Sequence, residues 1–229
     1  MVDASNPFDI VNRRVMLHNL QRQCPEFAPI AINMYRRPSR LFVSGSEILS
    51  QEGTTQGDNL AMHLFAMGTL PILQFLERST SALQVWLADD ATAVGKLEGL
   101  RTWWDDIVRE GIKYGYHVNA GKSCLILKNC NDHERALSIF KESDIKLKVT
   151  GQRHLGAVVG SQEFKDEYMS KLIDNCKNMV KTLSDYGQTQ PHASYSPFIL
   201  GVRSKAQNDL FYENNGRTWG QTYRGGQIN

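Results

Sequence analysis

The sequence predicts an α+β fold, in which an antiparallel sheet carries helices packed on one face. Apolar residues alternate with other residues over 83–87, which is the spacing of a strand, and they recur at helical spacing over 97–114. Predicted strands also come in pairs joined by short polar links, 41–43 with 47–49 and 83–87 with 91–94. Such pairs are typical of hairpins, so we expect the strands to run antiparallel.

The predicted elements follow from local patterns along the chain. The first helix is expected over 7–20, with Asn6 as its capping residue and Pro7 at the first helical position, where proline is favoured. The later elements are a helix over 25–35, a hairpin of 41–43 and 47–49, a polar loop over 50–58, a helix from 60, a hairpin of 83–87 and 91–94, a helix over 97–114, a strand over 123–127, a helix over 134–140, a hairpin of 146–149 and 154–159, and a helix over 163–183.

The composition is that of an ordinary globular protein. Of its 229 residues, 41% are hydrophobic and 22% are charged, enough for one core with a helical appendage. The net charge of +2 allows nucleic acid as a partner without arguing for it. The four scattered cysteines favour free thiols in a reducing compartment, and the N-terminus has no secretory signal. Because 60–76 is too interrupted for a membrane helix, we expect a soluble, intracellular protein with no membrane partner, in the cytoplasm or nucleus.

Two adjacent carboxylates, Asp89-Asp90, stand at the predicted turn of the second hairpin. Their mutual repulsion is relieved by a divalent cation, and magnesium prefers such oxygen ligands. Paired metal ions about 3.5–4 Å apart support phosphoryl transfer, so the turn is a candidate metal site. The alternative is that Asp-Asp simply makes a good turn. By contrast, Asp105-Asp106 lies on a predicted helix face, where we expect solvated charge.

The third carboxylate, Asp3, gains weight from its position in an ordered series: an aspartate, a glycine-containing polar loop that leads a helix, and the Asp-Asp turn. This order resembles the palm motifs of reverse transcriptases, in particular those of non-LTR retroelements. The matching segments, within residues 2–160, are Asp3-Ala4-Ser5-Asn6-Pro7-Phe8 with Val11-Asn12-Arg13, Glu52-Gly53-Thr54-Thr55-Gln56-Gly57-Asp58, Leu87-Ala88-Asp89-Asp90-Ala91, Gly115-Tyr116-His117-Val118-Asn119-Ala120-Gly121-Lys122-Ser123 and His154-Leu155-Gly156.

The resemblance implies a two-metal nucleotidyl transfer. Asp3 and Asp89 would bind two Mg²⁺ or Mn²⁺ ions, with Asp90 beside them, and the Ala4 carbonyl would add a backbone oxygen. A primer 3′-hydroxyl would then attack the α-phosphate of a dNTP on an RNA or DNA template. The implied activity is RNA-directed DNA polymerase.

The resemblance also assigns the residues around the nucleotide. Phe8 would stack under the sugar and exclude a 2′-hydroxyl, while Gln56 and Gly57 would support the incoming nucleotide and the template. Lys122 would lie near the phosphates and act on the leaving pyrophosphate. The hairpin at His154-Leu155-Gly156 would correspond to the primer grip.

The implied domains are a palm over 1–160, a helical connector or partial thumb over 161–206, and a disordered tail over 207–229. The fingers are expected to be missing and the thumb incomplete, so we expect weak or no polymerase activity from this chain alone. The chain departs from the family pattern at Leu87, where an aromatic residue is usual, and at Asn59, where proline is common.

Two alternatives to a polymerase remain open. The chain could be a catalytically dead retroelement remnant that acts at most as a nucleic-acid-binding or structural domain. It could also be a different carboxylate metalloenzyme, a nuclease or a nucleotide cyclase, built on a similar sheet.

Other motifs carry less weight. Residues 120–123 mimic the end of a phosphate-binding P-loop, but Tyr116 stands where that motif needs glycine and a strand is predicted next. Arg13-Arg14 could touch a phosphate backbone or be a solvated helix end. Trp103-Trp104 is expected to pack a helix on the sheet, with one ring partly exposed.

Overall fold

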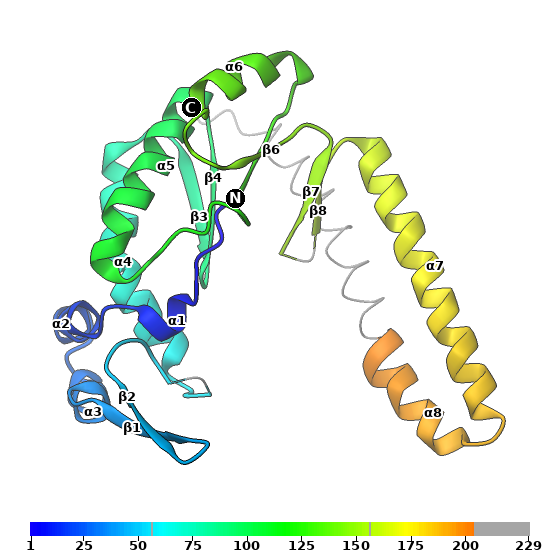
Figure 1. The fold of residues 1–229 in the computed structure, drawn as a ribbon, viewed down its shortest axis with the longest axis horizontal. Coiled ribbons are helices and arrows are strands. Elements are labelled where there is room, and N and C mark those ends of the chain that lie inside the picture. Colours follow the sequence, from blue (N-terminus) through cyan, green and yellow to red (C-terminus); the bar gives the residue numbers. More distant parts are fainter. Residues whose placement is uncertain (56, 156, 204–229) are drawn as a thin grey trace, which may run out of the picture. The chain divides into compact units, whose positions relative to one another are not determined.

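The structure is a computed structural model that describes residues 1–55, 57–155 and 157–203. Helices alternate along the described chain with small two-stranded sheets, of which three are antiparallel hairpins, and this confirms the mixed α and β composition that the sequence predicts (Figure 1). In the described part of the chain, no helix is both long and apolar enough to cross a membrane.

The contacts divide the chain into two compact units. The first comprises Met1–Leu125 and Asn131–Leu147, and the second comprises Ile126–Cys130 with the described residues from Lys148 onward. The elements are α1 (Pro7–Ile10), α2 (Arg13–Gln23), α3 (Ala28–Tyr35), β1 (Ser39–Val43), β2 (Ser46–Ser50), α4 (Ala61–Ser79), β3 (Leu83–Leu87), β4 (Asp90–Val94), α5 (Leu97–Gly111), η1 (Ile112–Tyr114), β5 (Cys124–Ile126), η2 (Cys130–Asp132), α6 (His133–Ile139), β6 (Lys146–Lys148), β7 (Gly151–His154), β8 (Ala157–Gly160), α7 (Gln162–Gly187), α8 (Pro191–Pro197) and η3 (Phe198–Arg203).

The first predicted hairpin is confirmed as β1 and β2. Val43 pairs with Ser46, which leaves Ser44 and Gly45 as a two-residue turn with φ angles of 49° and 81°. Left-handed backbone at both positions is the geometry of a type I′ turn, which matches the twist of paired strands.

The second predicted hairpin is also present, but its turn lies one residue earlier than the sequence predicts. Leu87 pairs with Asp90, so the turn consists of Ala88 and Asp89, and Asp90 opens β4. Ala88 has a φ angle of 55°, a left-handed conformation that residues with a side chain seldom adopt.

Residues Met1–Ser5 form backbone hydrogen bonds on both sides, through isolated bridges to β4 and to the chain around 117–124. On one edge, Val2 N donates to Ala91 O at 2.7 Å and Ala91 N donates to Val2 O at 3.2 Å. On the other edge the bonds run from Ser5 N to His117 O at 2.8 Å, from Asn119 N to Asp3 O at 2.8 Å and from Cys124 N to Met1 O at 3.0 Å. The N-terminal segment is therefore fixed between β4 and the chain around 117–124.

Strand β3 turns its apolar side chains outward. Leu83, Val85 and Leu87 are 69%, 70% and 58% exposed, whereas Gln84 and Trp86 are half-buried. The Gln84 side chain donates to a carbonyl of α4 at 2.9 Å, and its oxygen accepts from the indoles of Trp86 and of a tryptophan in α5, both at 3.1 Å. These three bonds satisfy the amide, which explains why a glutamine can lie on the inner face.

The predicted helix over 7–20 is wrong, because α1 ends at Ile10 and a second helix begins at Arg13. Asn6 has a φ angle of 44° and makes no capping bond, whereas Asn12 caps α2 by accepting from a backbone N–H at 3.1 Å. The break lies at Val11, which is fully buried and whose carbonyl accepts from Gly53 N at 2.9 Å. These tertiary contacts override the local preference for one helix.

Helix α5 supplies much of the core of the first unit. Trp103 and Trp104 are both buried, so the packing role is confirmed, although one ring was expected to stay partly exposed. Asp105 is exposed and pairs with Arg101 at 2.8 Å, as expected of solvated charge. That expectation is wrong for Asp106, which is buried and paired with Arg109.

The predicted pairing of 146–149 with 154–159 is wrong. Strand β6 pairs with β5, while β7 pairs with β8, which places Gly151 opposite Gly160. A Cβ at Gly151 would lie 2.5 Å from the Phe164 ring and 2.7 Å from the Val159 carbonyl oxygen. The glycine therefore allows a close approach that the strand pattern alone does not reveal.

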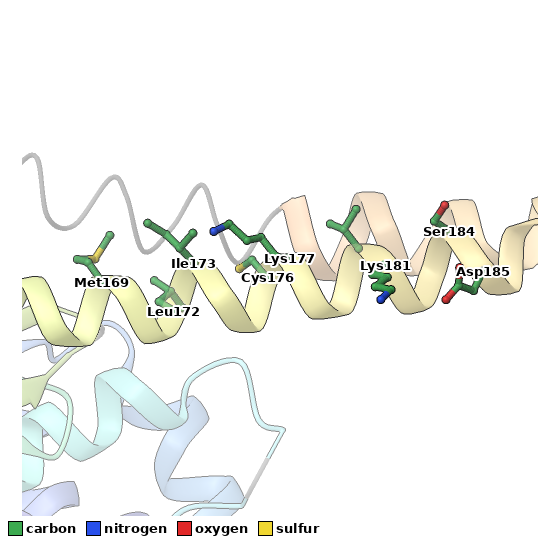
Figure 2. A pocket seen from close by; sticks show the side chains of 9 residues that line it. Met169, Leu172, Ile173, Cys176, Lys177, Lys181, Ser184 and Asp185 are labelled. Carbon is green, nitrogen blue, oxygen red and sulfur yellow. The ribbon is translucent and has the colours of Figure 1, made fainter.

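Helix α7 follows this hairpin in the second unit and is capped by Ser161, whose hydroxyl accepts from Phe164 N at 3.2 Å. None of its residues is buried. One side of α7 borders an open groove of about 560 Å³ (Figure 2). Its lining is Met169, Leu172, Ile173, Cys176, Lys177, Val180, Lys181, Ser184 and Asp185.

We predict that Gly111→Ala destabilises the first unit by about 1–3 kcal/mol, the usual cost of overpacking. A Cβ at this position would lie 2.4 Å from the Tyr116 carbonyl oxygen. Gly99→Ala in the same helix is the control, because its nearest neighbour is the rotatable Ser81 hydroxyl at 3.1 Å. The helix propensity of alanine should leave that variant unchanged or up to about 1 kcal/mol more stable. Urea denaturation measures the free energy of unfolding of both variants. Equal stability of the two would contradict the close approach of the Tyr116 carbonyl to Gly111.

Candidate metal and nucleotide site

The backbone brings Asp3 next to the Asp89-Asp90 turn. Because Val2 pairs antiparallel with Ala91, the same register places Asp3 opposite Asp90. Val2 and Ala91 are buried, and side chains alternate along paired strands, so Asp3 and Asp90 share the opposite face. Residues directly opposite one another have Cβ atoms about 4.5–5.5 Å apart. Two predicted metal ligands from distant parts of the chain are thus neighbours on the sheet.

Tyr116 lies against the Asp-Asp turn and near the carboxylates of Asp3, Asp89 and Asp90. Its hydroxyl donates to the Asp89 carbonyl oxygen at 2.8 Å, and its side chain is buried. Burial raises the pKa of the Tyr116 phenol, and the negative charges of Asp89, Asp90 and Asp3 raise this pKa further. All three aspartates are therefore close enough to act electrostatically on one buried hydroxyl.

The donor chemistry of this cluster fits a hard divalent cation, because Asp3, Asp89 and Asp90 offer only oxygen ligands. Within residues 1–55, 57–155 and 157–203, no group of three or more His, Cys, Asp or Glu side chains is arranged to hold a metal ion. The backbones of Asp3 and Asp90 are already held together by strand pairing. Cation binding would thus require rotation of the carboxylate side chains.

The loop predicted to support the nucleotide is fastened to the segment that follows Asp3. Thr54 N donates to the Phe8 carbonyl at 2.7 Å, and Gly53 N donates to the Val11 carbonyl at 2.9 Å. Gly53 has a φ angle of 75°, and a Cβ there would lie 2.1 Å from the Asp9 carbonyl oxygen. Only glycine permits this contact, so two motifs that are distant in sequence form one structural element.

The predicted sugar-gate residue and its surroundings lie on this element. Phe8 stacks against Phe65 of α4, with ring centroids 4.5 Å apart and an interplanar angle of 32°. Gly57 has a φ angle of 90°, and a Cβ added there would meet no atom within 4 Å. The backbone conformation therefore favours glycine at this position, and open space lies beside it. Gln56, the other predicted nucleotide contact, lies outside the described residues.

Arg13 is a buried residue and not a solvated helix end. It is only 5% exposed, and its guanidinium donates to the Gly53 carbonyl at 2.7 Å, the Ser50 carbonyl at 2.8 Å and the Ser50 hydroxyl at 2.7 Å. Its backbone N–H donates to the Glu52 carboxylate at 2.8 Å. Burial lowers the pKa of Arg13, and the nearby Glu52 charge opposes that shift. Arg14, by contrast, is exposed.

A buried tyrosine continues this network to the far end of the loop. The Tyr35 hydroxyl donates to the Asp58 carboxylate and accepts from Thr55 N at 3.1 Å, while the Arg13 guanidinium lies 5.2 Å from the ring centroid. Burial raises the pKa of Tyr35, and so does its bond to Asp58. The loop is thus held at both ends by buried polar side chains.

The fourth predicted motif is bonded directly to Asp3. The buried Ser123 hydroxyl accepts from Asp3 N at 3.1 Å and donates to the Asn119 carbonyl at 2.7 Å. These bonds fix the turn over 119–122, where the Lys122 side chain is exposed. Ser123 is followed by strand β5, which confirms that 120–123 is not the start of a P-loop helix.

The predicted primer-grip residues belong to the second unit. His154 pairs with Ala157, and the intervening Leu155 has a φ angle of 50° and is partly exposed. Gly156 lies outside the described residues. β7 and β8 therefore form a hairpin at the predicted primer-grip position, and a role in holding a primer stays a prediction.

Three polar residues that organise the site were not predicted from the sequence: Tyr35, Tyr116 and Ser123. Each is buried and bonded to residues far away in the chain. Tyr116 and Ser123 stand inside the fourth motif, which is the only signal that could have singled them out. Comparison with protein-family models found no match, and comparison with curated proteins found none either.

We predict that Arg13→Met destabilises the first unit by about 2–4 kcal/mol, because it removes a buried cation together with the bonds that satisfy two loop carbonyls. Arg14→Met removes the same charge from an exposed position and should change stability by less than about 0.5 kcal/mol. Chemical denaturation followed by tryptophan fluorescence compares the two. Similar stability of both variants would contradict a stabilising role for the buried Arg13 bonds.

Proposed function

We propose that this chain is the palm of a reverse-transcriptase-like polymerase, an RNA-directed DNA polymerase that joins a dNTP to a primer 3′-hydroxyl. The observation that carries the proposal is the pairing of Val2 with Ala91, whose register sets Asp3 opposite Asp90 at the Asp-Asp hairpin. Clusters of carboxylates on neighbouring strands are the arrangement that two-metal phosphoryl transfer uses.

The proposed mechanism assigns a task to each residue of the site. Asp3, Asp89 and Asp90 would hold two Mg²⁺ or Mn²⁺ ions, which when bound activate the attacking hydroxyl and neutralise charge on the phosphate. The stacked Phe8 would exclude a 2′-hydroxyl from the sugar position. The exposed ammonium of Lys122 would donate a hydrogen bond or a proton to the leaving pyrophosphate.

The fastened loop supports the same proposal. Gly53 and Thr54 bind the backbone beside Phe8, so the loop predicted to hold the nucleotide lies next to the predicted sugar gate. Arg13 and Tyr35 keep this arrangement fixed without using any exposed side chain. A preorganised loop of this kind reduces the entropy that nucleotide binding would otherwise cost.

A catalytically dead remnant is the second candidate function. Leu87 is exposed at the end of β3, where the resemblance would place an aromatic residue beside the primer end. On this alternative, the chain would bind a primer–template duplex at most, and it would not extend the primer.

Primer extension on an RNA template with Mg²⁺ or Mn²⁺ tests the proposal. We predict that Asp3→Asn and Asp89→Asn each lower extension by at least about 100-fold, because each removes a charge that holds the ions. Asp105→Asn, which alters an exposed carboxylate on α5, should leave extension unchanged. Absence of extension above the Asp89→Asn background in either metal, even when a fingers segment is supplied, would reject the polymerase and leave the remnant. Cleavage of the primer or template instead of extension would favour a nuclease.

A further inference from the structure

Tyr116 is a buried side chain whose hydroxyl contacts the Asp-Asp turn. Its side chain is 1% exposed, and its hydroxyl donates to the Asp89 carbonyl oxygen at 2.8 Å. The Trp86 ring of β3 packs against the Tyr116 ring, with centroids 5.0 Å apart and an interplanar angle of 55°. The tyrosine thus contacts both the strand that enters the turn and the turn itself.

The backbone of Tyr116 is fixed as firmly as its ring. Tyr116 N donates to the Gly111 carbonyl at 2.9 Å, and the missing side chain of Gly111 admits the Tyr116 carbonyl oxygen. One residue earlier, Gly115 has a φ angle of 76°, and a Cβ there would lie 2.0 Å from the Ile10 carbonyl oxygen. The backbone that carries the phenol is therefore closely packed, and moving the phenol away from the turn would cost free energy.

The turn of Ala88 and Asp89 needs a contact that holds its conformation. It has only two residues, and Ala88 adopts a left-handed φ angle of 55° without being glycine. That conformation is disfavoured for residues with a Cβ, and it persists where surrounding contacts hold it. The hydrogen bond to Asp89 O is a contact of this kind at the adjacent residue.

We propose that Tyr116 is a positioning residue for the metal site. By donating to the Asp89 carbonyl, its hydroxyl fixes the strained turn. The fixed turn then aligns the Asp89 and Asp90 carboxylates with Asp3. In this role the tyrosine acts through the turn and is not itself a ligand of the ions. This inference rests on the proposed function, since it assumes that the three carboxylates bind divalent cations.

The test is a titration of the full chain with Mn²⁺ alone, followed by electron paramagnetic resonance. Tyr116→Phe removes only the hydroxyl, and we predict a Kd for Mn²⁺ about 10-fold higher, the usual effect of losing an outer-shell bond. In primer extension, the Mn²⁺ concentration for half-maximal rate should rise by about the same factor. The rate at saturating Mn²⁺ should recover to near that of the unchanged protein.

A second variant separates positioning from general stability. Ile107→Val trims a fully buried side chain of α5 and should lower the urea midpoint while leaving the Kd for Mn²⁺ unchanged. Wild-type affinity in Tyr116→Phe, or an equal loss of affinity in Ile107→Val, would overturn the inference. Asp89→Asn separates failure of the proposed function from failure of the role of Tyr116. If Asp89→Asn binds Mn²⁺ as tightly as the unchanged protein, the proposed function fails as well. If Asp89→Asn binds Mn²⁺ more weakly while Tyr116→Phe does not, only the role of Tyr116 is rejected.

Discussion

The candidate site depends on the pairing of residues Met1–Ser5 with chain segments on both sides. One edge exchanges two hydrogen bonds with Ala91, and the other is bonded to 117–124. Because backbone donors and acceptors in a buried strand need partners, this pairing has one favourable register. That register decides which residue lies opposite Asp90. A shift of one residue would move Asp3 to the buried face and place Val2 or Ala4 beside the turn.

Around this sheet, buried polar side chains determine where the exposed loops lie. Gln84 binds β3 to two helices, Arg13 binds the loop after β2, and Tyr116 binds the turn before β4. Gln84 and Arg13 each bond to several groups at once, whereas the Tyr116 hydroxyl bonds to the Asp89 carbonyl. Buried polar groups that are satisfied in this way make the structure around them rigid. The predicted nucleotide and metal residues are mostly exposed or half-buried, so their geometry is set by these inner residues. Under the proposed function, the chemistry of the site and the stability of the fold would therefore depend on different side chains at the same place.

Local patterns predicted much of the architecture. The hairpins β1–β2 and β3–β4, the helices α4 and α5 and the strand after Ser123 follow from alternation, helical spacing and turn residues, which act over a few neighbours. Two of the wrong predictions concern segments whose hydrogen bonds come from far away in the sequence. The helix over 7–20 breaks at Val11 because that residue is bonded to Gly53, and β6 pairs with β5 instead of forming a hairpin with the chain that follows it.

The sequence by itself determined the types of residue at the site, the order of the motifs and the α+β class, since each depends on composition or short-range spacing. Only the tertiary structure decided that Arg13 is buried while Arg14 is exposed, and that β3 faces inward with Gln84 and Trp86. Adjacent arginines have the same local pattern, and an alternating strand fits either face. Which side chain is buried depends on the long-range bonds available to it, and those exist only once distant segments have come together.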